Sequence, residues 1–225
     1  MLSNPPLPGS ESCPELMLFD LDGVLMDSLP AMRAAWEAVT AELGVPVPFA
    51  AYAQHLGRPF GDILALFDLG KGEEGGAGFA EAYESAAVRF AHLARPFPGV
   101  EQALQDIVAA DCRLGVVTSK SAARAQPMLA VLGAPFAVLR TPDQGRGKPS
   151  PDTLLLALVE AATDPADALY VGDMPVDQEA AQRAGLRYAH AAWGYGAPTK
   201  PLPLILQEPS QLVDLARGLP SRGTA

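Results

Sequence analysis

The chain has 225 residues, of which 49% are hydrophobic and 19% charged, and its formal net charge is −10. This length fits one large domain or two small ones, and the composition excludes an intrinsically disordered chain. The negative charge argues against nucleic acid and anionic membranes as partners, and no apolar run reaches the ~18 residues of a membrane span. Any phosphate site in this chain therefore needs positive charge of its own.

The two ends of the chain are expected to be flexible tails, over residues 1–14 and 219–225. The N-terminal segment lacks the basic and apolar regions of a signal peptide. Cys13 and Cys112 are the only cysteines, which argues against a disulfide framework. We therefore expect a cytoplasmic protein, as a monomer or a weak homodimer.

The first part of the chain combines one strand with a long helical block. An apolar run predicts a strand over 15–20, and a helix is expected to begin with Ser28 as its N-cap and to end at Gly44. Further helices are predicted near 48–56, 60–68 and 77–94. A block of this size is too long for a loop.

We assign this block, residues 27–96, to an inserted all-helical cap domain. Residues 15–26 and 97–218 then form the core. Strands are predicted there at 113–118, 136–140, 168–171 and, as the last one, 187–191, with helices at 99–110, 121–132, after Pro151, at 176–184 and at 209–218. This alternation is typical of an α/β fold with a doubly wound parallel sheet, a Rossmann-like core.

The first strand runs directly into Asp20-Leu21-Asp22-Gly23. Ligands of open α/β sheets bind at the carboxyl ends of the strands. Two carboxylates there, with a glycine that lets the backbone approach a ligand, form a candidate reaction centre. A simple Asp-Gly turn is the structural alternative.

Two later strand ends carry groups suited to a phosphate. Thr118 and Ser119 follow a buried strand and offer hydroxyls, although they also fit an N-cap cluster. Lys148 stands between Gly147 and Pro149 in a loop that prolines stiffen. Such a loop favours a lysine aimed at a ligand over a solvated one.

Asp173 follows another buried strand, and Asp177 comes four residues later. This spacing places both carboxylates on one face of a helix start, where oxygen ligands suit Mg²⁺. Aspartates that complement the helix dipole are the alternative.

In this order, the motifs resemble those of the haloacid dehalogenase superfamily, in its phosphoglycolate-phosphatase-like branch, over about residues 15–218. The resemblance implies a phosphatase that acts on a small phosphorylated metabolite. It implies that Asp20 is the nucleophile that becomes an aspartyl-phosphate and that Asp22 is the general acid and base. It implies further that Lys148 acts in catalysis.

The same resemblance implies the ligand sites. Phosphate would be bound by Leu21, Asp22, Gly23, Thr118, Ser119 and Lys148. Mg²⁺ would be bound by Asp20, Asp173 and the backbone carbonyl of Asp22, and Asp177 would contact these ligands without binding the ion itself.

Arg58, which follows a turn glycine in the cap, is our candidate for a specificity residue that contacts the substrate beyond its phosphate group. Residues 193–196 resemble a loop of phosphoglycolate phosphatases, and we favour simple packing for them over a place at the rim of the site. A phosphosugar mutase of the same family remains open, because it uses the same pair of aspartates. A phospho-accepting signalling receiver is an alternative from another class, but such a protein carries its motifs in another order along the chain. An inactive scaffold is a further alternative, but it would lack motif residues, and none is missing here.

Overall fold

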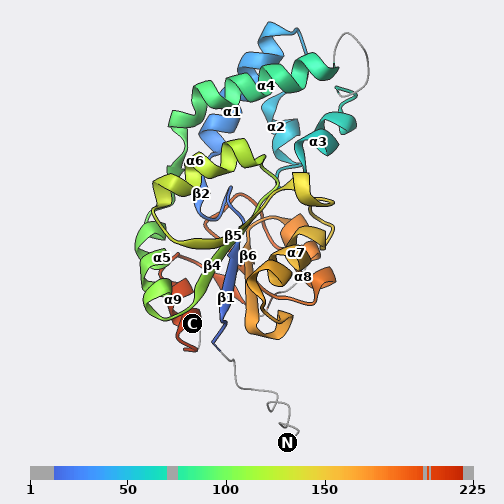
Figure 1. The fold of residues 1–225 in the computed structure, drawn as a ribbon. Helices are drawn as coiled ribbons and strands as arrows, with labels where there is room; N and C mark the ends of the chain where they lie inside the picture. Colours follow the sequence, from blue (N-terminus) through green and yellow to red (C-terminus); the bar gives the residue numbers. More distant parts are fainter. Residues whose placement is uncertain (1–12, 70–75, 200–201, 203, 220–225) are drawn as a thin grey trace, which may run out of the picture.

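The computed structural model describes residues 13–69, 76–199, 202 and 204–219. Within these residues, six parallel strands form one sheet in the order β5-β4-β1-β6-β7-β8, with the first strand in the middle (Figure 1). The strands are β1 (Leu16–Phe19), β4 (Arg113–Val117), β5 (Phe136–Arg140), β6 (Ala168–Gly172), β7 (Arg187–Ala191) and β8 (Ile205–Leu206). The predicted parallel sheet is confirmed.

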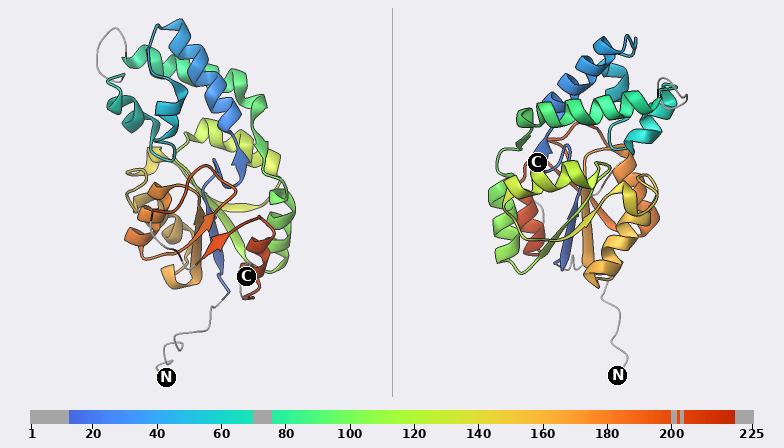
Figure 2. Two further views of the ribbon diagram at one scale, coloured as in Figure 1. Left: turned by 180° about the vertical axis from the view of Figure 1, so that it is seen from behind. Right: turned by 45° about the horizontal axis from the view of Figure 1, so that its top comes forward.

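Helices cover both faces of this sheet, as Figures 1 and 2 show. On one face lie α5 (Val100–Ala109), α6 (Ala122–Leu132) and α9 (Gln211–Ala216), and on the other α7 (Asp152–Ala161) and α8 (Pro175–Ala184). Met17 and Phe19 of β1 enter the first hydrophobic cluster, whereas Leu16 and Leu18 enter the second. Because successive side chains of a strand point to opposite faces, β1 is buried on both, as its unbroken apolar run predicts.

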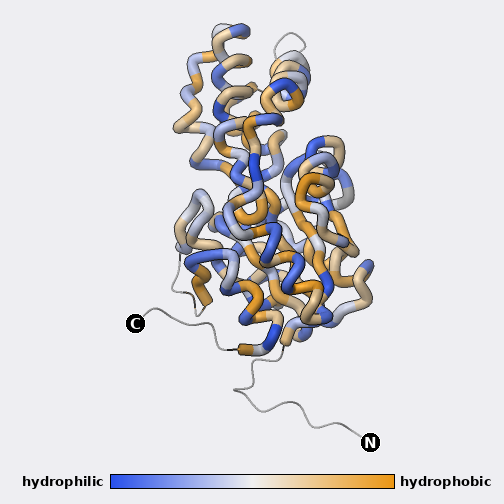
Figure 3. Tube along the Cα trace, turned by 90° about the vertical axis from the view of Figure 1, so that its left-hand side faces the viewer, coloured by the Kyte–Doolittle hydropathy of each residue, from blue (hydrophilic) through white to orange (hydrophobic). Residues whose placement is uncertain are grey.

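A helical cap lies beyond the carboxyl ends of the strands (Figures 1 and 2). It contains α1 (Leu29–Glu42), α2 (Phe49–Ala53), α3 (Phe60–Leu66), α4 (Gly76–Phe90) and the 3₁₀ helix η1 (Ala91–Leu93). Its hydrophobic cluster includes Trp36, whose ring stacks on Tyr52 with 4.3 Å between centroids. Figure 3 shows hydrophobic and hydrophilic residues alternating along these helices, as expected of helices with one buried face.

Three short strands differ from our expectations. β2 (Met26–Asp27) and β3 (Arg95–Pro96) pair antiparallel where the chain leaves the core and returns to it. β8 extends the sheet beyond β7, so the prediction that strand 187–191 is the last one was wrong. Strands of two residues are too short to show an alternating pattern. Two further 3₁₀ helices, η2 (Pro142–Gln144) and η3 (Pro165–Asp167), lie in core loops.

In the ranges that the structure describes, none of the helices has both the length and the apolar character that crossing a membrane requires.

Candidate active site

The turn after β1 places Asp20 and Asp22 at the carboxyl end of the central strand. The side chain of Asp20 is buried and accepts a hydrogen bond from the Leu21 N–H at 2.8 Å, and Asp22 is partly exposed. Gly23 adopts a φ of +92°, and a Cβ at this position would lie 2.2 Å from Oδ2 of Asp173. Only glycine therefore lets this turn approach the loop after β6 so closely.

Lys148 is buried beside two carboxylates. Its Nζ lies 2.9 Å from Oδ1 of Asp20 and 2.7 Å from Oδ1 of Asp177, and it donates to the Tyr170 hydroxyl at 3.2 Å. Burial opposes the charge on Lys148, but Asp177 and Asp20 outweigh it and raise the pKa of Lys148 above its ordinary value. The lysine is therefore cationic at neutral pH and supplies the local positive charge that an acidic chain needs to hold a phosphate.

The two aspartates after β6 use their oxygens differently. Oδ2 of Asp177 accepts the N–H groups of Asp173 at 3.3 Å and Met174 at 2.9 Å, and its Oδ1 is taken by the lysine and by the Tyr170 hydroxyl. Oδ2 of Asp173 accepts the Tyr195 N–H at 2.7 Å. Oδ1 of Asp173, in contrast, is buried without a hydrogen-bond partner. Asp177 thus anchors Lys148, whereas Asp173 keeps an oxygen for a ligand.

Three buried carboxylates fit a divalent cation. Asp20, Asp173 and Asp177 each offer one oxygen, and these oxygens lie within 4.8 Å of one another. Burial raises the pKa of Asp20 to about 7, although Lys148 opposes the rise. Burial, Asp177 and Asp20 raise the pKa of Asp173 well above its usual range. A set of oxygen donors that repel one another, one of them unpartnered, suits a hard cation.

Asp22 has partners of its own. Its Oδ1 lies 3.1 Å from Nζ of Lys120 and accepts a hydrogen bond from the Ser28 hydroxyl. Lys120 is 6% exposed. We did not predict either partner as a site residue. A lysine just after a buried strand, in a chain with an excess of acidic residues, was the available signal for Lys120.

A cavity of about 40 Å³ separates the core from the cap. Asp20, Thr118 and Ser119 line it from the core, and the exposed Arg58 lines it from the cap. The Ser119 hydroxyl donates to the backbone carbonyl of Gly57, which joins core and cap. The structure thus places Thr118 and Ser119, predicted to bind phosphate, and Arg58, the predicted specificity residue, around one cavity.

Tyr195 connects the site to the cap. Its hydroxyl accepts the N–H groups of Ser28 at 2.7 Å and Leu29 at 3.1 Å, which start helix α1. The Ser28 side chain forms no cap hydrogen bond, because its hydroxyl is used by Asp22. Tyr195 also lines the small cavity, so the 193–196 loop lies at the rim of the site, the role that we did not favour from the sequence.

Comparisons with known proteins agree with this geometry. The family model of haloacid dehalogenase-like hydrolases matches residues 17–191. A phosphoglycolate phosphatase from Xylella fastidiosa (strain 9a5c) is 34% identical over 196 residues, which cover 84% of each chain. The N-acetylmuramic acid 6-phosphate phosphatase of Pseudomonas aeruginosa is 31% identical, over 88% of this chain and 93% of its own. The crystal structure of a hydrolase from Pseudomonas syringae has a TM-score of 0.78 at 23% identity, over 89% of this chain and 96% of its own. This chain therefore belongs to the haloacid dehalogenase-like hydrolase family.

Proposed function

We propose that this protein is a magnesium-dependent phosphatase that hydrolyses a small phosphorylated metabolite through an aspartyl-phosphate intermediate. The buried pair of Asp20 and Lys148 at the end of β1 carries the proposal, because it sets a carboxylate nucleophile beside a cation. The two relatives described above are phosphatases for phosphoglycolate and N-acetylmuramic acid 6-phosphate, which supports the same reaction class here.

In the first step, a carboxylate oxygen of Asp20 attacks phosphorus, and the bond from phosphorus to the leaving-group oxygen breaks. Asp22 gives a proton to that oxygen. Lys148 and the hydroxyls of Thr118 and Ser119 stabilise the charge that spreads over the phosphoryl oxygens. The N–H groups of residues 21–23 are further donors by resemblance, although here that of Leu21 is bonded to Asp20 and that of Gly23 to the Met26 carbonyl.

In the second step, water attacks the phosphorus of the aspartyl-phosphate and restores Asp20. Asp22 now acts as the base and takes a proton from that water. The contacts of Asp22 with Lys120 and Ser28 both go to Oδ1, so we assign the transferred proton to Oδ2. Lys120 stabilises the carboxylate form of Asp22 between the two steps.

We propose that Asp20, Asp173 and the backbone carbonyl of Asp22 bind the cation, with Asp177 holding Lys148 and the loop in place. The unpartnered, buried Oδ1 of Asp173 supports this assignment. A bound cation would neutralise charge on the phosphoryl group and on the carboxylates. Mg²⁺ is the cation that we propose, because the donors are all oxygens.

We propose further that the cap, residues 27–96, opens and closes over the site as a unit. Two contacts support a closed arrangement here: Ser119 bonds to the carbonyl of Gly57, and Arg124 of the core lies 3.0 Å from Glu84 of the cap. We expect the protein in the reducing cytoplasm, as a monomer or weak homodimer; its two cysteines are free. A phosphosugar mutase is not favoured, because the relatives reported above are phosphatases.

The direct test is hydrolysis of a panel of phosphorylated metabolites with Mg²⁺, with the Asp20→Asn variant as control. The variant keeps the shape of the side chain but loses the charge of the nucleophile, so turnover and acyl-phosphate formation should both disappear. Chelator should abolish wild-type turnover, and Mg²⁺ should restore it. Near-normal turnover by Asp20→Asn, freed of wild-type enzyme, would contradict the mechanism.

A further inference from the structure

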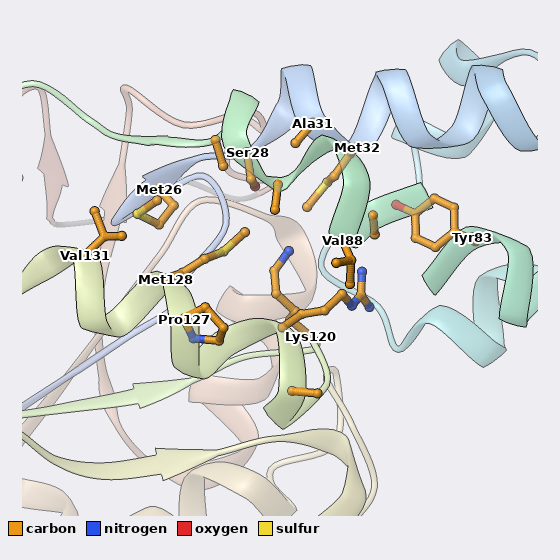
Figure 4. Close-up of a pocket in the computed structure, with 15 residues that line it drawn as sticks. Met26, Ser28, Ala31, Met32, Tyr83, Val88, Lys120, Pro127, Met128 and Val131 are labelled. Carbon is orange, nitrogen blue, oxygen red and sulfur yellow. The ribbon is translucent and has the colours of Figure 1, made fainter. Parts of the chain in front are cut away.

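A larger cavity of about 300 Å³ lies between the cap helices α1 and α4 and the core helix α6 (Figure 4). Eleven of its fifteen lining residues are apolar. Met32 from α1 and Met128 from α6 reach into it from opposite sides in Figure 4. Val88 and Val131, which also line it, are 69% and 59% exposed. The molecule thus holds an apolar chamber that opens between cap and core.

This cavity adjoins the proposed reaction centre. Met32, Lys120 and Arg124 line both this cavity and the small one that contains Asp20. Lys120 and Ser28, two of its lining residues, are the side chains that contact Asp22. Asp22, the proposed proton donor, lines the small cavity, and the apolar cavity begins at the side chains that contact Asp22.

We propose that this cavity receives the leaving group, and that the substrate is a phosphate monoester whose leaving group is apolar and uncharged. The proposal rests on the phosphatase function proposed above. Asp22 must lie beside the leaving-group oxygen in order to protonate it. The small cavity of about 40 Å³ has no room for a leaving group of several carbons.

Both charged side chains of the lining are already paired with a carboxylate of the protein. Each polar side chain of the cavity has a partner within the protein: Ser28 and Lys120 bind Asp22, Tyr83 bonds to Tyr52, and Arg124 pairs with Glu84. A carboxylate or sugar hydroxyl placed against the eleven apolar residues of this lining would lose its water without gaining a partner, which is unfavourable. An alkyl or aryl group, in contrast, gains from burial.

The size of the cavity indicates the size of this group. An apolar cavity of ~150 Å³ in another protein accommodates benzene, so about 300 Å³ has room for roughly twice as much. Flexible thioether side chains on two walls can adjust to groups of different shape. We therefore expect leaving groups of about six to ten carbons.

A homologous series of n-alkyl phosphates tests this inference, because it varies burial while the reacting alcohol stays nearly constant. From ethyl to hexyl phosphate with Mg²⁺, kcat/KM should rise by ~3- to 4-fold for each methylene that enters the cavity. 5-Carboxypentyl phosphate, of similar length, should be at least ~10-fold poorer than hexyl phosphate. A flat series, or a preference for the carboxylate, would overturn the proposal.

A matched pair of variants on α6 locates the effect. Ala123 and Ala130 are both exposed on this helix, but only Ala123 lines the cavity. We compare kcat/KM for hexyl phosphate with kcat/KM for ethyl phosphate. Ala123→Phe should lower this ratio by at least ~10-fold, because the new ring would prevent the burial of about two methylenes. Ala130→Phe should leave this ratio unchanged. Equal ratios in both variants would place the leaving group elsewhere.

Binding of 1-hexanol, the product alcohol, gives a readout that needs no turnover. Ligand-observed NMR should detect hexanol on the wild type and on Ala130→Phe, with much weaker binding to Ala123→Phe. If short esters are hydrolysed but the series is flat and hexanol does not bind, the cavity assignment fails while the phosphatase function stands. If no ester is hydrolysed, the phosphatase function fails, and the leaving-group assignment fails with it, even where hexanol binds.

Discussion

Replacing the two buried aspartates after β6 by asparagine should change the stability of the metal-free protein in different ways. Asp177 is bonded through both oxygens, and its Oδ1 pairs with Lys148 at 2.7 Å. Asp173 has one oxygen without a hydrogen-bond partner. The same isosteric substitution therefore removes a carboxylate that is fully hydrogen-bonded and ion-paired at position 177. At position 173 it removes one that neighbouring carboxylates repel.

Asp177→Asn should be strongly destabilising. It leaves the Lys148 ammonium with one carboxylate partner and turns an NH₂ group toward either the lysine or two backbone N–H groups. Breaking a buried ion pair costs about 3–5 kcal/mol. A chain of this size loses about 2–4 °C in Tm per kcal/mol, so the expected fall is about 6–20 °C.

Asp173→Asn should not destabilise the metal-free protein at pH 8. The folded state raises the pKa of Asp173 through burial and the nearby carboxylates, so folding favours its protonated form. The stability that this group contributes is present below the unfolded pKa of ~3.9 and is lost as the pH rises through the folded pKa. At pH 8, above the unfolded pKa, this contribution is reduced in the wild type, whereas asparagine stays neutral at every pH. The Tm of the variant should equal or exceed that of the wild type.

Thermal unfolding followed by circular dichroism at pH 8, first with EDTA and then with Mg²⁺, measures both effects. Magnesium at about 100 times its Kd should stabilise the wild type by about 2.7 kcal/mol, and Asp173→Asn should lose this gain. The reasoning is wrong if Asp173→Asn is as unstable in EDTA as Asp177→Asn. It is also wrong if magnesium stabilises Asp173→Asn as much as the wild type.

Three further substitutions or measurements follow from the described contacts. Tyr195→Phe removes the acceptor of two N–H groups at the start of α1. Each N–H left without a partner should cost about 1–3 kcal/mol of stability, so the midpoint of urea unfolding should fall. An unchanged midpoint would mean that water replaces the hydroxyl. Burial raises the pKa of Cys112 to about 11, which leaves roughly 0.1% thiolate at pH 8. Ellman's reagent should therefore react with one thiol, the exposed Cys13, in the native protein and with two in denaturant, and two fast native thiols would contradict this. Arg58 lines the small cavity and not the apolar one, so Arg58→Ala should lower kcat/KM for ethyl and hexyl phosphate by a similar factor of ~10; a loss confined to one ester would make Arg58 a reader of the leaving group.

The sequence by itself determined where polar groups follow buried strands. Apolar runs that end at Asp20, Thr118 and Asp173 predict buried strands, and the carboxyl ends of parallel strands meet at one edge of a sheet. The periodicity of the cap region likewise predicted its helices. These features are local, because the pattern of burial along one element is written in that element alone.

The tertiary structure decided which groups became neighbours. The position of β1 between β4 and β6 sets Asp20 close to Asp173, and the packing of α8 brings Asp177 against Lys148 from a distant loop. The contact of Tyr195 with helix α1 and the apolar chamber between α1, α4 and α6 likewise join segments that are far apart in the chain. No local pattern encodes such contacts, since they depend on how whole elements pack and on the volume that their side chains leave unfilled.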